Sequence, residues 1–277
     1  MKVFKSLFNF YINASIHVAL GVYAMTWITC IEYDVAYDED YLYFVFFATI
    51  TAYNFIKYFG LAKFHHRSLA NWLKAIQIFS AIAFVFMCYY LLQLNSATYI
   101  LLGVLGLITF LYAIPFLPKH YLFDEQQNLR EISGIKIYII ALVWAAVTVL
   151  LPLANNGIEF SFDVIITGFQ RFCFVIVLML PFEIRDLNYD SLKLATIPQK
   201  IGIKKTKLIG VLLLMVFLMS EFFKDGLDYT EVISTLIICF VTLLFLVFSS
   251  QKKSKYYCAF WVEAIPIFWL GILLLLS

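Results

Sequence analysis

Nine apolar stretches, each close to the length that crosses a bilayer, constrain this chain more than any other feature. A helix rises 1.5 Å per residue, so about 20 apolar residues span the hydrocarbon core of a membrane. The chain is 63% hydrophobic and 14% charged, outside the usual range of soluble proteins. We therefore expect one polytopic membrane domain over residues 1–277, an all-α bundle of nine transmembrane helices around a central cavity. The stretches lie roughly at residues 9–30, 41–60, 73–94, 97–116, 135–154, 162–181, 206–223, 231–250 and 256–276.

The loops between these stretches alternate in charge, and this predicts an orientation. Residues 32–40 carry five acids and no Lys or Arg, and the loop around Lys224 is also acidic. Eighteen of the twenty Lys and Arg residues fall in the other loops and at the N-terminus. Because basic loops stay in the cytoplasm, we expect a cytoplasmic N-terminus and an extracytoplasmic C-terminus, in a bacterial inner membrane. A net charge of +2 gives no indication of nucleic-acid binding.

Three carboxylates follow the sixth apolar stretch, in the segment that runs from Pro181 to Gly202. If the segment is helical, spacings of three and four residues put Glu183, Asp186 and Asp190 on one face. Crowded carboxylates favour a hard divalent cation such as Mg²⁺, which prefers oxygen ligands. The alternative is an ordinary solvated helix end, since acids at membrane boundaries are common.

The spacing of Asp186 and Asp190, followed by Thr196, Pro198 and Gly202, resembles the second acidic motif of the UbiA superfamily of intramembrane prenyltransferases. The resemblance implies a UbiA-like fold and transfer of a polyprenyl group from a prenyl diphosphate to a lipophilic acceptor, aromatic in some members. It also implies that the two aspartates are catalytic and hold Mg²⁺, with Glu183 beside them. Neither the acceptor, nor the prenyl chain length, nor any protein partner follows from the motif.

A second resemblance lies at Tyr112, Pro115 and Lys119 and in residues 129–148, which are similar to the fourth and fifth helices of that family. In the family an aromatic and basic pair near this point helps to position the diphosphate, so the resemblance implies this role for Tyr112 and Lys119. Taken by themselves, the two residues are typical of an interface tyrosine and a positive-inside lysine.

The first acidic motif of the family has lost its acids here. Asn54 is present, but Phe55, Tyr58 and Ala62 stand where the family has aspartates. No acid lies between residues 54 and 74, and four cations replace the motif: Lys57, Lys63, Arg67 and Lys74.

Two outcomes of this exchange stay open. In the first, Asn54, Lys57, Lys63 and Arg67 bind the diphosphate through charge-assisted hydrogen bonds, and a single metal stays on the second motif. In the second, Lys57 neutralises the second acidic motif, and the protein is a non-catalytic isoprenoid-binding or structural homologue. A secondary transporter is a distant third class, because Pro152 and Pro266 do not occupy corresponding positions in two halves.

Four polar residues inside the apolar stretches carry further predictions. Asn13 and His17 share one helix face, where they either line a substrate cavity or form an interhelical hydrogen bond. Arg171 and Glu263 are charges stranded at depth, and their positions predict that they pair with each other as a structural tie. The five cysteines are isolated and are interpreted as packing residues.

Overall fold

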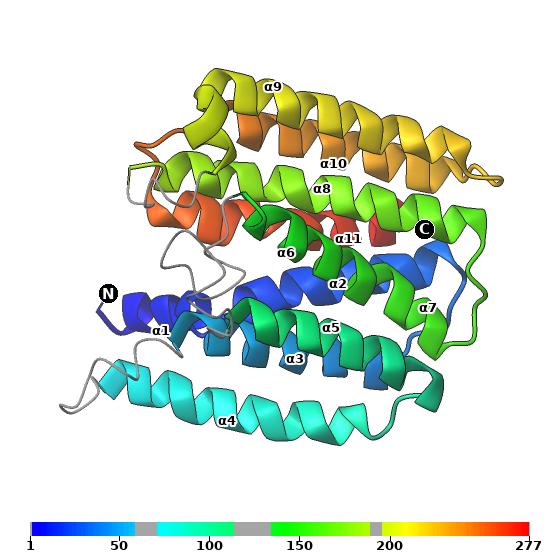
Figure 1. The fold of residues 1–277 in the computed structure, drawn as a ribbon, viewed down its shortest axis with the longest axis horizontal. Helices are drawn as coiled ribbons and strands as arrows, with labels where there is room; N and C mark the ends of the chain where they lie inside the picture. Colours follow the sequence, from blue (N-terminus) through cyan, green and yellow to red (C-terminus); the bar gives the residue numbers. More distant parts are fainter. Residues whose placement is uncertain (1, 59–70, 114–133, 189–195, 277) are drawn as a thin grey trace, which may run out of the picture.

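The computed structural model describes residues 2–58, 71–113, 134–188 and 196–276, and these form a bundle of helices lying side by side (Figure 1). The all-helical membrane architecture expected from the sequence is confirmed. In chain order the α-helices are α1 (Lys2–Asn13), α2 (Ile16–Glu32), α3 (Glu39–Tyr58), α4 (Asn71–Leu91), α5 (Tyr99–Ala113), α6 (Lys136–Ala145), α7 (Leu151–Asn155), α8 (Phe162–Asp186), α9 (Ile197–Ser220), α10 (Tyr229–Val247) and α11 (Ile265–Leu276). Short 3-10 segments are η2 (Ser96–Thr98) and η6 (Glu221–Phe223), and short π-helical segments are η4 (Ala146–Leu150) and η7 (Tyr257–Val262).

The predicted count of nine crossings is not confirmed. Among the described residues, seven helices are long and apolar enough to cross a membrane, and an eighth results if α1 and α2 are taken as one bent span. The helix α3 also occupies one of the predicted stretches, but it carries Glu39, Asp40 and Lys57 and is not among the seven. Length and composition therefore support seven or eight spans.

The two ends of the bundle differ in which chain segments they hold. At one end, α3, α5 and α8 end and α4, α6 and α9 begin; we call this the motif end (Figure 1). At the opposite end, α2 and α9 end and α3 and α10 begin; we call this the acidic end. The segments that resemble the two family motifs thus meet at one end of the bundle, as the alternation of loop charge predicted.

Two backbone features shape the motif end. The helices α1 and α2 meet at an angle of 55°, and Ser15 at the break has a left-handed backbone with φ of 62°. In α9, Gly202 has φ of 80° and interrupts the helix after its first turn. Only glycine adopts this conformation without a steric penalty. The glycine that ends the second motif is therefore required by the backbone.

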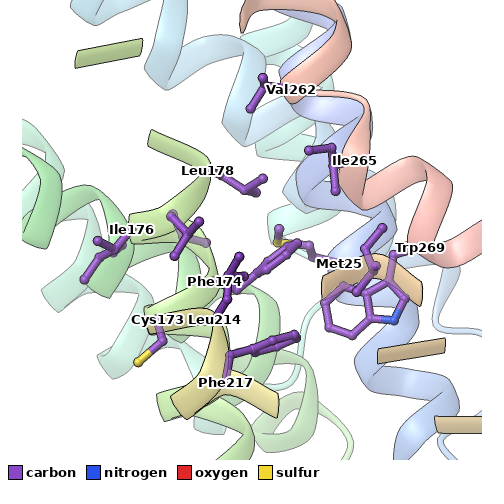
Figure 2. Packing of buried hydrophobic residues seen from close by; sticks show 14 of the residues in the cluster. Met25, Cys173, Phe174, Ile176, Leu178, Leu214, Phe217, Val262, Ile265 and Trp269 are labelled. Carbon is purple, nitrogen blue, oxygen red and sulfur yellow. The ribbon is translucent and has the colours of Figure 1, made fainter. Parts of the chain in front are cut away.

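The main core packs α8 against α2, α9 and α11. Figure 2 shows Phe174 of α8 close to Phe217 of α9 and Trp269 of α11. The Phe174 ring stacks on Phe217 at 5.1 Å between centroids and meets Trp269 edge-on at 5.2 Å. Close approach of α9 to its neighbours depends on Gly210, where a Cβ atom would lie 2.5 Å from a Leu246 methyl group. The five cysteines are free thiols, as expected of packing residues.

Candidate substrate site at the motif end

Asn54 holds the break between α1 and α2. Its side-chain nitrogen donates to the Ala14 carbonyl at 3.0 Å and to Ser80 Oγ at 2.8 Å, and its oxygen accepts from Ser15 Oγ at 2.8 Å. Tyr58 adds a bond of 2.9 Å to the Asn13 carbonyl. The strained backbone of Ser15 persists because these contacts fix it from outside the helix. Asn54 is buried, so the structure supports a role in shaping the break rather than the predicted contact with substrate.

Lys57 lies one turn further along α3, next to the same break. Its ammonium group donates to Ser15 Oγ at 2.8 Å and lies 5.8 Å from the centre of the Tyr53 ring. The side chain keeps substantial exposed surface, and the Glu263 carboxylate is within electrostatic range. A lysine bonded to one hydroxyl has two further N–H donors for an anionic ligand.

Arg185, and not Lys57, holds the aspartate of the second motif. Its Nε and Nη2 atoms donate to the two Asp186 carboxylate oxygens at 2.6 and 2.8 Å, and its Nη1 donates to the Lys255 carbonyl at 3.2 Å. The predicted neutralisation of Asp186 by Lys57 is therefore wrong, because a neighbouring arginine at the end of α8 already supplies the charge. The Asp186 side chain stays 34% exposed.

Glu183 does not join Asp186 in a common site. It is buried, and its Oε2 atom accepts from the backbone nitrogen of Ile197 at 3.2 Å, at the first turn of α9. Thr196 and Gln199 complete the cap of that helix. A carboxylate at a helix N-terminus is stabilised by the helix dipole. Glu183 therefore anchors α9, and its role as a metal ligand stays a prediction, because Asp190 of the same motif lies outside the described residues.

No group of three metal-binding side chains occurs in the part of the chain that the structure describes. Asp190, Lys63, Arg67 and Lys119, which the sequence predicts for the same site, lie outside the described residues, as do Pro115 and Ala62. The described carboxylates alone do not complete a site for Mg²⁺, since Glu183 caps a helix, Asp186 is held by Arg185, and the second aspartate of the motif lies outside the described residues.

A polar cluster continues from Lys57 into the bundle. Trp144 of α6 donates to Tyr53 Oη at 3.0 Å, and Tyr112 of α5 is buried within electrostatic range of the same tyrosine. Glu263, between η7 and α11, is within electrostatic range of Lys57, Tyr53 and Arg185. Sequence reasoning missed Glu263 as a member of this site. Its depth was the available signal, since it lies only six residues after the start of η7, which is at the motif end.

The predicted pair between Arg171 and Glu263 is wrong. Arg171 is the tenth residue of the 25-residue helix α8 and lies toward the acidic end. It pairs with Glu32 at 3.7 Å, donates to Thr29 Oγ1 at 3.1 Å and lies over the Trp269 ring at 4.8 Å. The prediction failed because depth was counted from the end of an apolar stretch that stops five residues before α8 does.

His17 forms the interhelical tie that was one of its two predicted roles. Its Nε2 atom donates to the Phe260 carbonyl at 2.8 Å, because a carbonyl oxygen can only accept. The other ring nitrogen lies 2.7 Å from Tyr11 Oη and forms a second hydrogen bond with that hydroxyl. Asn13 contributes its carbonyl to the bond with Tyr58 described above.

An apolar groove of about 440 Å³ begins at this tie. One wall of the groove is formed by a single face of α11, together with the residue just before this helix. The residues of this wall are Ala264, Ile267, Phe268, Gly271, Ile272 and Leu275. Tyr11, His17 and Phe260 close the end that faces the motif end, and Tyr11 is within electrostatic range of Glu263. The groove is therefore apolar along α11 and polar where it approaches Lys57 and Glu263.

The fold resembles that of a known membrane enzyme. A solved structure described as that of digeranylgeranylglyceryl phosphate synthase in membranes matches with a TM-score of 0.56 and 16% sequence identity, covering 98% of this chain and 97% of that chain. That enzyme is a prenyltransferase of the UbiA superfamily. No protein-family model and no curated protein matches the sequence. At 16% identity the likeness shows the fold alone: over nearly its whole length, this chain is folded like that enzyme.

Proposed function

We propose that this protein is a UbiA-like intramembrane prenyltransferase, which transfers a polyprenyl group from a prenyl diphosphate to a lipophilic acceptor. One observation carries the proposal. Lys57 and Asp186, which come from two separate sequence motifs, lie at the same end of a bundle that is folded like such an enzyme. Separate motifs that converge at one end of a bundle supply different groups to one ligand.

The charges at the motif end suit the chemistry of a diphosphate. As the allylic C–O bond breaks, negative charge develops on the departing diphosphate, and fixed cations stabilise that charge. Lys57 offers free N–H donors for this purpose, beside a polar interior that includes Tyr53 and Tyr112. The proposal includes Mg²⁺ held by Asp186 and Asp190, where it would supply further positive charge to the same oxygens. It requires Asp186 to exchange its contact with Arg185 for the ion.

The groove along α11 suits the apolar part of the substrate. Its walls are aliphatic and aromatic, and its polar end at Tyr11 and His17 lies toward the cluster of Lys57 and Glu263. A prenyl diphosphate has the same polarity, with a long apolar chain and a charged head. On the basis of loop charge, the proposal puts the motif end in the cytoplasm, where diphosphates are made available in solution.

The second candidate is a non-catalytic homologue that binds isoprenoid lipids. It is favoured by the pairing of the motif charges, since Arg185 engages both oxygens of Asp186 and Glu183 caps α9. A site in which the remaining acids already have protein partners keeps its shape without a metal. Binding of the lipid would then persist without turnover.

The test is diphosphate release by the full-length protein in lipid nanodiscs, with geranylgeranyl diphosphate as donor and a membrane lipid extract as source of acceptors. We expect Mg²⁺-dependent release that Asp186→Asn lowers by about 100-fold or more, as for other losses of transition-state charge stabilisation. Lys57→Ala should weaken donor binding and make it less sensitive to salt, because a screened cation contact is removed. Asp40→Asn, an exposed acid at the acidic end, is the matched control and should leave release unchanged.

The two candidates predict different results. Saturable donor binding with no diphosphate release at any Mg²⁺ concentration would support the non-catalytic homologue. Release that is unaffected by Asp186→Asn would contradict the enzyme proposal as stated. Neither binding nor release would contradict both.

A further inference from the structure

The acidic end contains a buried polar cluster that the proposed function does not use. Lys224, which follows η6, lies 3.0 Å from the Glu221 carboxylate and 3.8 Å from that of Glu231 on α10. Glu32 and Arg171 form a second ion pair next to it, between α2 and α8. Gln170, the residue before Arg171 on α8, donates from its side-chain nitrogen to Glu221 at 2.8 Å, which brings the two pairs into one region.

Two atoms in this cluster lack a hydrogen-bond partner. They are Arg171 Nη1 and Glu32 Oε2, and their side chains are only 1% and 7% exposed. The closest approach of the two groups, 3.7 Å between Arg171 Nη2 and Glu32 Oε2, is too long for a hydrogen bond. A buried charged group with an unsatisfied donor or acceptor is costly, so a partner is expected.

A small, largely enclosed cavity of about 10 Å³ lies beside the Arg171 and Glu32 side chains. Its wall includes Glu32 and Arg171, together with Thr167, Gln170, Thr235 and Trp269. About 10–15 Å³ measured in this way is the space that one water molecule needs, provided that two or more polar groups face it. The cavity meets both conditions.

We propose that this cavity holds a single water molecule that bridges Arg171 Nη1 and Glu32 Oε2. The hydrogen-bonding needs of the two atoms indicate which molecule fills the cavity. Arg171 Nη1 needs an acceptor, which a metal cation cannot provide, and Glu32 Oε2 needs a donor, which a halide cannot provide. Water supplies both, and any larger hydroxyl compound exceeds the volume. The water completes the ion pair and so ties α2 to α8 at the acidic end.

An experimental structure of the full-length protein in nanodiscs, at a resolution that shows ordered water, tests the proposal directly. We expect a density peak within about 3 Å of both atoms. An empty cavity between side chains in the same positions would overturn the proposal. A direct hydrogen bond between Arg171 and Glu32 that closes the cavity would also overturn it.

A cavity-filling variant gives a second, independent test. Thr235→Ile adds a methyl group to the wall and should displace the water, which leaves the two charged atoms without a partner. We expect its melting temperature in detergent to fall by at least about 2–4 °C relative to Thr235→Val, which has the shape of threonine and is the matched control. An equal or higher melting temperature would mean that the cavity is dry, and would overturn the proposal.

The same comparison in a background with Arg171→Leu and Glu32→Leu separates lost water from simple overpacking. Without the two charged groups nothing needs the water, so Thr235→Ile should no longer lower the melting temperature relative to Thr235→Val. An equal fall in both backgrounds would show overpacking and would contradict a bridging water.

Discussion

The two ends of the bundle use acidic and basic residues in opposite ways. At the acidic end, Arg171 and Glu32 are almost fully buried and pair with each other across helices. At the motif end, Asp186 pairs with its neighbour in sequence and stays one-third exposed, and Lys57 bonds to a neutral hydroxyl. Charged side chains that tie helices together are buried between those helices, whereas charged side chains that bind a ligand must be accessible to it. The difference in burial separates structural from candidate functional groups.

This difference has an energetic consequence. Loss of one partner from a buried ion pair strands the other charge in a medium that solvates it poorly. Loss of one partner from an exposed pair returns the other to water at little expense. The stability of the protein should therefore depend strongly on the buried ion pair of Arg171 and Glu32 at the acidic end and weakly on the partly exposed pair of Arg185 and Asp186 at the motif end.

The largest expected effect is at Arg171. Arg171→Leu strands the Glu32 carboxylate and should lower the free energy of unfolding by about 3–5 kcal/mol. Arg171→Leu with Glu32→Leu should recover most of that loss, because no unpaired charge remains. Thermal unfolding in detergent measures both. Recovery instead by Arg171→Leu with Glu263→Leu would contradict the pairing in the structure.

An intermediate effect is expected at Asn54, which holds the motif end through neutral hydrogen bonds. Asn54→Leu leaves the Ser15 hydroxyl and the Ala14 carbonyl without this partner and should lower stability by about 1–3 kcal/mol. Thr51→Val, one turn earlier on α3, is the control and should have little effect, because the buried Thr51 hydroxyl makes no hydrogen bond. Equal losses from the two variants would show that the Asn54 bonds contribute nothing specific.

The smallest expected effect on stability is at Asp186. Asp186→Asn removes a partly exposed ion pair and should change the free energy of unfolding by no more than about 1 kcal/mol, although we expect a large loss of diphosphate release. Glu221→Gln, the same chemical change at the acidic end, should cost more, because Glu221 is buried and bonded to Lys224 and Gln170. Comparable melting temperatures for the two variants would contradict the distinction between the ends.

Much of the fold follows from local features of the sequence. Within the described residues, each predicted apolar stretch lies mainly on one helix or on consecutive helices, because length and hydropathy are properties of a segment by itself. The alternation of loop charge predicts that both motifs lie at one end of the bundle. The glycine at position 202 is explained by its backbone conformation, which only glycine adopts readily.

The partners of the charged residues were decided only by the tertiary structure. Arg171 meets Glu32, Asp186 meets Arg185, Glu183 caps α9, and Lys57 is tied to Ser15. Each pairing depends on where helices end, how they rotate about their axes and which neighbours they pack against, and none of these is fixed by the composition of one segment. A shift of one turn moves a side chain about 5.4 Å along the axis, which is enough to exchange one partner for another. The sequence alone therefore determined which segments are helical and which loops share an end of the bundle, because both follow from the hydropathy and charge of single segments. The exact helix ends and the packing of the helices determined which charges are structural and which remain accessible.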